Sequence, residues 1–84
     1  MGKQPLRPGE ALVFPFGERS ERPVHTWFVR GSIDVLWVEH EHVTSVETMK
    51  PWSYRRGNVA DTVIELPAGS ATSVEPGWIV TLAD

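Results

Sequence analysis

The segment IDVLWVE, residues 33–39, is apolar on both of the faces that it would present as a β-strand. Side chains alternate along a strand, so one face would carry Ile33, Val35 and Trp37 and the other Asp34, Leu36 and Val38. A strand with two apolar faces needs cover on both sides. We therefore expect this strand to lie inside the fold, with a layer of chain against each face.

Five other short segments have the composition of strands and are separated by Pro and Gly. They are residues 11–16, 24–30, 42–50, 59–66 and 78–83. Residues 17–23 and 51–58 are expected to be loops, and residues 70–74 have room for one helical turn. Frequent turns between six short strands predict an all-β fold, a small antiparallel barrel or sandwich with one short helical turn.

Two irregularities in this pattern predict local geometry. Pro15 has no backbone N–H, which places the first strand at a sheet edge or beside a bulge. The apolar residues of 42–50 are spaced by three rather than two, which indicates a bulge or a helical turn.

Two further expectations concern which strands pair and which side chains face the core. A short break joins 24–30 to 33–39, so we expect these two strands to pair antiparallel. In 59–66, the even-numbered residues are expected to face the core, with Asp61 and Glu65 facing outward.

The chain has 84 residues, a net charge of −3 and no cysteine. This length suffices for one domain, placed at residues 9–84 behind a flexible arm of residues 1–8. Without cysteine, neither a disulfide nor a thiolate zinc site can supplement the core. The acidic balance argues against nucleic acid and anionic membranes as partners, and no apolar run could span a bilayer. We expect a soluble, most simply cytoplasmic protein without a cofactor.

The sequence Glu39-His40-Glu41-His42 brings together four side chains that can each bind a metal ion. His40 and His42 would share a strand face, but His25 or a distant carboxylate would have to supply a third ligand. The position between two apolar strands favours a solvated hairpin tip instead. A type I′ turn needs positive φ at both central residues and suits His-Glu badly, so we expect a longer loop or a strained tip. No metal site is assigned.

Asp34 is the one charged residue inside the apolar run, and a buried carboxylate needs a partner. Arg30 or a backbone N–H near Gly31 is close in sequence. A structural role for Asp34 in the turn is favoured, and a charge that orients a ligand is the functional alternative. His25 with Asp34 would also make an acid–base couple. No nucleophile elbow is present, so no catalytic residue is assigned.

The sequence KPWSYRR, residues 50–56, interleaves cations with Trp52 and Tyr54. Such a segment can form a stacking surface for bases, sugars or anions. The structural alternative, which is favoured, has Trp52 covering the core from a loop while the cations remain solvated. Core packing is likewise expected of Trp27, Trp37 and Trp78.

Three segments resemble the domain-of-unknown-function family 192, also called the uncharacterised ACR family, in its short prokaryotic form. They are VHTWFVRGSIDVLWVE, VETMKPWS and VIELPAGSATSVEPGW, and together the resemblance spans about residues 9–82. The chain lacks the family's Gly-Leu-Met segment before the first strand, and Trp78 replaces an Asp. The resemblance implies a compact, mainly β fold and supplies no activity. A missing N-terminal strand would leave a sheet edge open for a partner.

The function that we expect from the sequence is a non-catalytic binding module for a small polar or anionic ligand or a peptide. The expected site is rimmed by His25, Arg30, Asp34, Lys50 and Trp52. One alternative is an interaction protein that uses an open edge strand, as a monomer or weak homodimer. The other is a low-turnover hydrolase that uses His25 and Asp34.

Overall fold

The computed structural model describes residues 10–26 and 31–81. Its strands are β1 (Leu12–Glu21), β2 (Val24–His25), β3 (Ile33–Glu39), β4 (His42–Met49), β5 (Tyr54–Arg55) and β6 (Val59–Pro67). The described ranges contain no helix, which confirms the all-β class. The proposed division into an arm and one domain stays a prediction, because residues 1–9 lie outside the described ranges.

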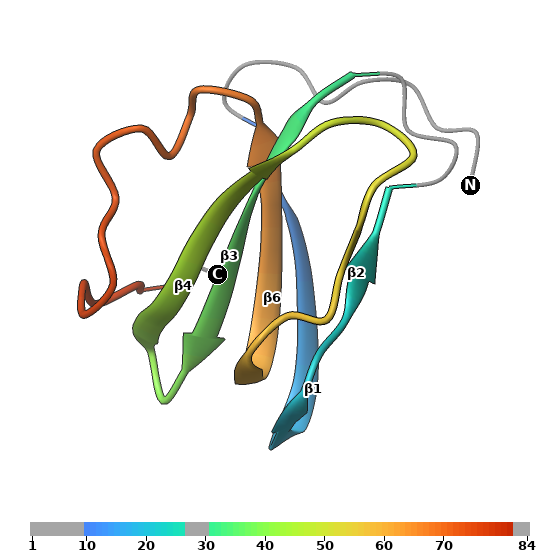
Figure 1. The fold of residues 1–84 in the computed structure, drawn as a ribbon. Coiled ribbons are helices and arrows are strands. Elements are labelled where there is room, and N and C mark those ends of the chain that lie inside the picture. The colour runs from blue at the N-terminus through green and yellow to red at the C-terminus, as the bar shows by residue number, and fades with distance from the viewer. Residues whose placement is uncertain (1–9, 27–30, 82–84) are drawn as a thin grey trace.

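The strands form a four-stranded antiparallel sheet in the order β1-β6-β3-β4 and a separate two-stranded pair, β2-β5. The β2-β5 pair lies against one face of the sheet, while the orange-to-red segment after β6 runs down the side of β4 (Figure 1). The expected pairing of 24–30 with 33–39 is wrong. Both edges of β3 are taken by β4 and β6, so β2 pairs with β5 in the segment that was expected to be a loop.

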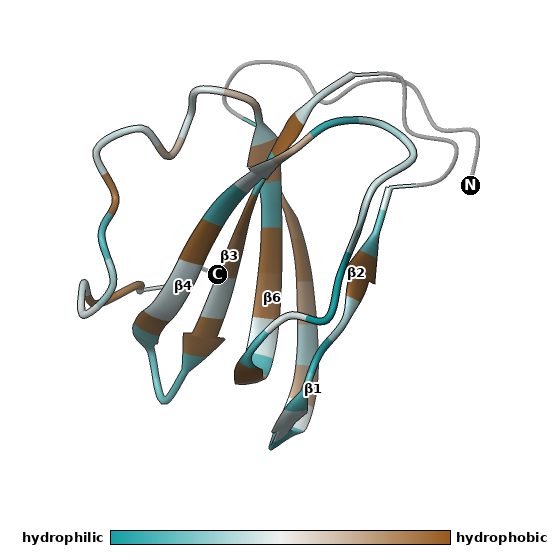
Figure 2. Ribbon diagram, viewed as in Figure 1, coloured by the Kyte–Doolittle hydropathy of each residue, from teal (hydrophilic) through white to brown (hydrophobic). Residues whose placement is uncertain are grey.

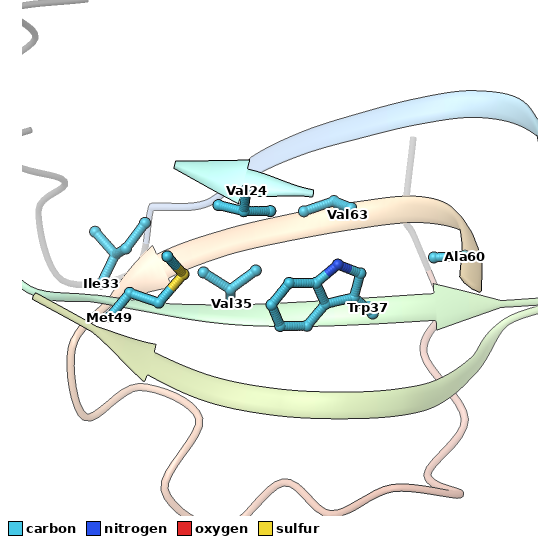
Figure 3. Packing of buried hydrophobic residues seen from close by; sticks show 7 residues of the cluster. All are labelled: Val24, Ile33, Val35, Trp37, Met49, Ala60 and Val63. Atoms are coloured by element: carbon cyan, nitrogen blue, oxygen red, sulfur yellow. The ribbon is translucent and has the colours of Figure 1, made fainter. Parts of the chain in front are cut away.

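β3 is buried on both faces, as the sequence predicted. One face packs in a cluster made of Val24, Ile33, Val35, Trp37, Met49, Ala60 and Val63. The other packs in a cluster made of Leu36, Val38, Val43, Ile64 and Ala71. Figure 3 shows the first cluster, in which Val24 of β2 lies close to Val63 of β6 above β3. In Figure 2 the brown bands of the strands give way to teal at the β3–β4 turn.

Trp37 fixes how the first face is covered. Its side chain is wholly buried, and its indole Nε1 donates a hydrogen bond of 2.7 Å to the backbone carbonyl of Arg22. A buried indole N–H needs such a partner, because leaving it unpaired costs free energy. The bond therefore ties the end of β1 and the start of β2 to the central strand.

β1 lies at one edge of the described sheet, and its register against β6 shifts between Pro15 and Ser20. Both observations confirm the prediction from Pro15. The expected loop 17–23 is wrong for most of its length, because the chain rejoins β6 after the irregularity, where Ser20 pairs with Ala60. Association through this edge stays a prediction.

The register between β3 and β4 shifts by one residue, which confirms the predicted bulge. Trp37 pairs with Ser45 and Val38 with Val43, so Thr44 is the extra residue. The hydroxyl of Thr44 donates to the carbonyl of Trp37 at 3.0 Å. The bulge is thus held by its own side chain.

Residues 68–80 cover the second face of the sheet without forming a regular element. Three successive hydrogen-bonded turns occupy the place of the expected helical turn. The predicted strand 78–83 is reduced in its described part to one bridge, between Ile79 and His42. Trp78 is 48% exposed, so the expectation that it packs in the core is wrong. Backbone hydrogen bonds join Gly77 and Trp78 to Val43 of β4.

The β3–β4 connection is a two-residue turn, with φ of +50° at His40 and +67° at Glu41. Of the two expected forms of this connection, the longer loop is therefore wrong and the strained two-residue turn is the one observed. The carboxylate of Asp61 accepts the N–H of His40 at 2.9 Å, and the N–H of Val80 donates to the carbonyl of Glu41 at 2.7 Å. The bond from His40 is the main cause that lowers the pKa of Asp61, and the hydroxyl of Thr62 adds to it. These contacts hold an unfavourable turn in place.

Gly57 provides a test of the Trp37 contact. It has a φ of +80°, and a Cβ there would lie 2.0 Å from the carbonyl oxygen of Arg22 and 2.6 Å from Nε1 of Trp37. We expect Gly57→Ala to lower the free energy of unfolding by about 3 kcal/mol or more, from backbone strain and the broken indole bond. Gly17→Ala is the matched control, because Gly17 also has positive φ but nothing lies within 4 Å. Gly17→Ala should lower the free energy of unfolding, measured by urea titration, by only about 1 kcal/mol. Equal losses in the two variants would show that the contact between Trp37 and Arg22 is not the cause.

Asp61→Asn tests the tether on the β3–β4 turn. A carboxyl whose pKa falls below its usual 3.8 on folding stabilises the protein above the unfolded pKa, and this contribution is lost as pH falls through the folded pKa. We expect the variant to unfold at a lower urea concentration than the wild type at pH 7. The difference should shrink between about pH 5 and pH 3. A difference that stays constant across this range would show that the charge of Asp61 has no part in holding the turn.

Candidate functional site

A pocket of about 210 Å³ opens between β1, β2 and β6. Its lining residues are Phe14, Phe16, Pro23, Val24, His25, Val63 and Glu65. Paired residues on neighbouring strands have side chains on the same face, and Phe14 pairs with Val63. The register between β1 and β6 therefore builds the apolar wall of the pocket.

His25 and Glu65 supply the ionisable side chains of this pocket. His25 is exposed at the rim, whereas Glu65 is only 9% exposed. The expectation that Glu65 faces outward is wrong, because β2 and β5 cover the face of β6 that carries it. The predicted alternation holds for Ile64 and Leu66, which face the second cluster, but is wrong at Ala60, which packs in the first cluster with Val63. The sequence also has no local signal for a second layer above the face that carries Glu65.

Arg22 borders the pocket beside Phe16. Its guanidinium carbon lies 4.0 Å from the centroid of the Phe16 ring, a cation–π contact. Nη2 of Arg22 donates to the carbonyl of Glu18 at 2.7 Å, and Nε donates to that of Ala60 at 3.3 Å. These bonds fix the guanidinium over Phe16, which is 45% exposed at the pocket edge.

Asp34 lies on the opposite face of β3 and is 2% exposed. Its Oδ2 accepts the backbone N–H groups of Gly69 and Ala71, each at 2.9 Å, and its Oδ1 accepts the hydroxyl of Thr48 at 2.7 Å. Among the described residues these partners replace the expected N–H near Gly31, while Arg30, the other expected partner, lies outside the described residues. The carboxylate ties the segment after β6 to the sheet, some 35 residues away in sequence.

The four predicted site residues that the structure describes divide between two faces of the sheet. His25 lies in β2, whereas the contacts of Asp34 lie on the other side of the sheet, so these two do not share a site. Arg30 lies outside the described residues. Lys50 and Trp52 belong to the loop that follows β4, beside β2. The structure thus groups His25 with Lys50 and Trp52 on one side of the sheet and separates them from Asp34.

Thr26 holds the loop of Lys50 and Trp52 against the end of β2. It is 1% exposed, and its Oγ1 donates to the carbonyl of Lys50 at 2.6 Å and accepts the N–H of Ser53 at 2.8 Å. Its backbone carbonyl accepts the N–H of Trp52 at 2.8 Å. Trp52 is nevertheless 67% exposed, so the expectation that it covers the core is wrong. Val24 and Met49 fill that core instead.

A second cavity of about 200 Å³ lies at the β3–β4 turn. Its lining residues are Val38, His40, Glu41, Asp61, Thr62, Ile64 and Val80. Nδ1 of His42 lies 2.9 Å from the carbonyl oxygen of His40, so that ring is engaged with its own turn. Across residues 10–26 and 31–81, no three His, Asp or Glu side chains group as a metal site would require. The same ranges hold no helix with the length and hydropathy to cross a membrane.

Two known proteins are similar to this chain over most of its length. A UPF0127 protein of Pyrococcus abyssi is 41% identical over 66 residues, covering 74% of this chain and 56% of that protein. A UPF0127 protein of Pyrococcus horikoshii is 36% identical over 74 residues, covering 83% and 64% respectively. The chain therefore spans between half and two thirds of the length of these relatives.

No solved structure matches the chain significantly. The family model described as Uncharacterized ACR matches residues 1–82, which include the eight residues expected to form an arm. This match and the two relatives agree with the resemblance seen in the sequence. The chain belongs to the domain-of-unknown-function family 192, the Uncharacterized ACR family.

Proposed function

We propose that this domain is a non-catalytic binding module whose ligand site is the pocket between β1, β2 and β6. The observation that carries the proposal is the composition of that pocket. Five of its seven lining residues are apolar, and His25 and Glu65 bring ionisable groups to it. Apolar walls with a few placed polar groups are typical of small-molecule sites.

The size and lining of the pocket limit the kinds of ligand that it can bind. Its volume of about 210 Å³ lies below the roughly 300–1,000 Å³ of sites for drug-sized molecules. The ligand is therefore a small molecule with an apolar ring or short chain, or a peptide side chain of that size. The polar end of the ligand lies beside His25 at the exposed rim, because Glu65 is only 9% exposed and the walls formed by Phe14 and Val63 offer no polar partner.

The hydrolase alternative receives no support from this geometry. It needs His25 and Asp34 in one site, and Asp34 is engaged with Gly69, Ala71 and Thr48 on the other side of the sheet. A cytoplasmic location and a monomeric or weakly dimeric state stay predictions.

Thermal-shift screening with small aromatic and aliphatic acids, alcohols and amines tests the pocket. We expect at least one compound to raise the melting temperature of the wild type. Phe16→Ala and His25→Ala should each reduce its affinity about tenfold, because they remove a wall and a polar contact. The matched control is Trp78→Ala, which also truncates a half-exposed aromatic residue, outside the pocket lining.

Trp78→Ala should respond to the compound as the wild type does. A compound that stabilises Phe16→Ala and His25→Ala as strongly as the wild type would place its site elsewhere. The proposal would also fail if no compound of these classes stabilised the wild type.

A further inference from the structure

The segment after β4 presents alternate residues to solvent. From residue 50 to residue 58 every even-numbered residue is exposed and every odd-numbered one is partly buried. The exposed side chains include those of Lys50, Trp52, Tyr54 and Arg56. We call these four side chains the Trp52 surface. In Figure 2 this segment is largely teal where it runs beside β2.

The backbone of Trp52 has a conformation that a bulky residue rarely adopts, with φ of +62°. Such a conformation persists only where the surroundings impose it, and it is concentrated at functional sites. Here the imposing group is Thr26, whose hydroxyl and carbonyl bind Lys50, Trp52 and Ser53. The result is a fixed loop that holds a large aromatic ring 67% exposed.

Two cations of the Trp52 surface are not compensated within the described ranges. Nε of Arg55, the residue between Tyr54 and Arg56, forms an ion pair of 2.7 Å with Glu47. No ion pair of Lys50 or Arg56 occurs among the residues that the structure describes. The surface therefore carries local positive charge on a chain whose net charge is −3.

We propose that the Trp52 surface docks an acidic, extended segment of a partner protein. Trp, Tyr and Arg are the residues that most often dominate protein–protein binding, and a fixed loop presents them without an ordering cost. Lys50 and Arg56 give charge complementarity to Asp and Glu side chains. A long nucleic acid fits less well, because the net negative charge of the chain opposes a dense polyanion.

Selection from a random twelve-residue peptide library displayed on phage tests this proposal. We expect the selected peptides to be rich in Asp and Glu and to bind more weakly as NaCl is raised. Trp52→Asn should weaken these peptides at least about tenfold. Asn tolerates positive φ, so the loop is retained. Trp78→Ala, an exposed aromatic residue of the segment after β6, is the control and should bind as the wild type does.

Lys50→Ala combined with Arg56→Ala gives an independent variant. Lys50 contributes only its carbonyl to the Thr26 contacts, so the loop should keep its conformation. This variant should bind the peptides more weakly, and the binding that remains should no longer weaken as NaCl is raised. Neutral or basic selected peptides, or equal binding by both variants and the wild type, would overturn the proposal. Tighter binding of oligothymidylate than of any peptide, with the same dependence on Trp52, would overturn it in favour of nucleic acid.

Discussion

The structure depends on a central strand that has no face for solvent. Ile33–Glu39 pairs on both edges and is buried on both sides, so the rest of the chain must supply two covers. Each cover is tied to the sheet by a buried polar group with complete hydrogen bonding. Asp34 binds the segment after β6, and the indole of Trp37 binds the end of β1. Buried polar groups of this kind fix one arrangement of layers, because any other would leave them unpaired.

The same constraint places the candidate functional surfaces. The β2-β5 cover is short, so it leaves a pocket beside β1 and β6. Thr26, at the end of β2, in turn fixes the loop that exposes Trp52. On the other face, both carboxylate oxygens of Asp34 accept hydrogen bonds from within the fold, and these bonds hold the segment after β6 on the sheet. Both candidate surfaces therefore lie on the side of the sheet that β2 covers, whereas Asp34 lies on the other side.

The fold class and the position of β3 could be predicted because they depend on local patterns. Two apolar faces require a central strand, and Pro15 requires an edge or a bulge. Two of the three partners of Asp34 could not be predicted, because they are backbone N–H groups 35 and 37 residues away that any sequence can offer. Glu65 was assigned to solvent because alternation gives the face of a residue, and not whether a second layer covers that face. For the same reason the separation of His25 from Asp34 could not be predicted. It depends on which face of the sheet each residue lies on and on which segment covers that face.

Amide hydrogen exchange in the variant Asp34→Ala, measured by NMR against the wild type, tests most directly whether Asp34 holds the segment after β6 on the sheet. Removal of the carboxylate leaves the N–H groups of Gly69 and Ala71 without acceptors. The account predicts that these two amides exchange at least tenfold faster, while those of Val35 and Trp37 remain protected by their pairing with β4 and β6. Unchanged protection at Gly69 and Ala71 would contradict it, because the cover would then be held by something other than Asp34.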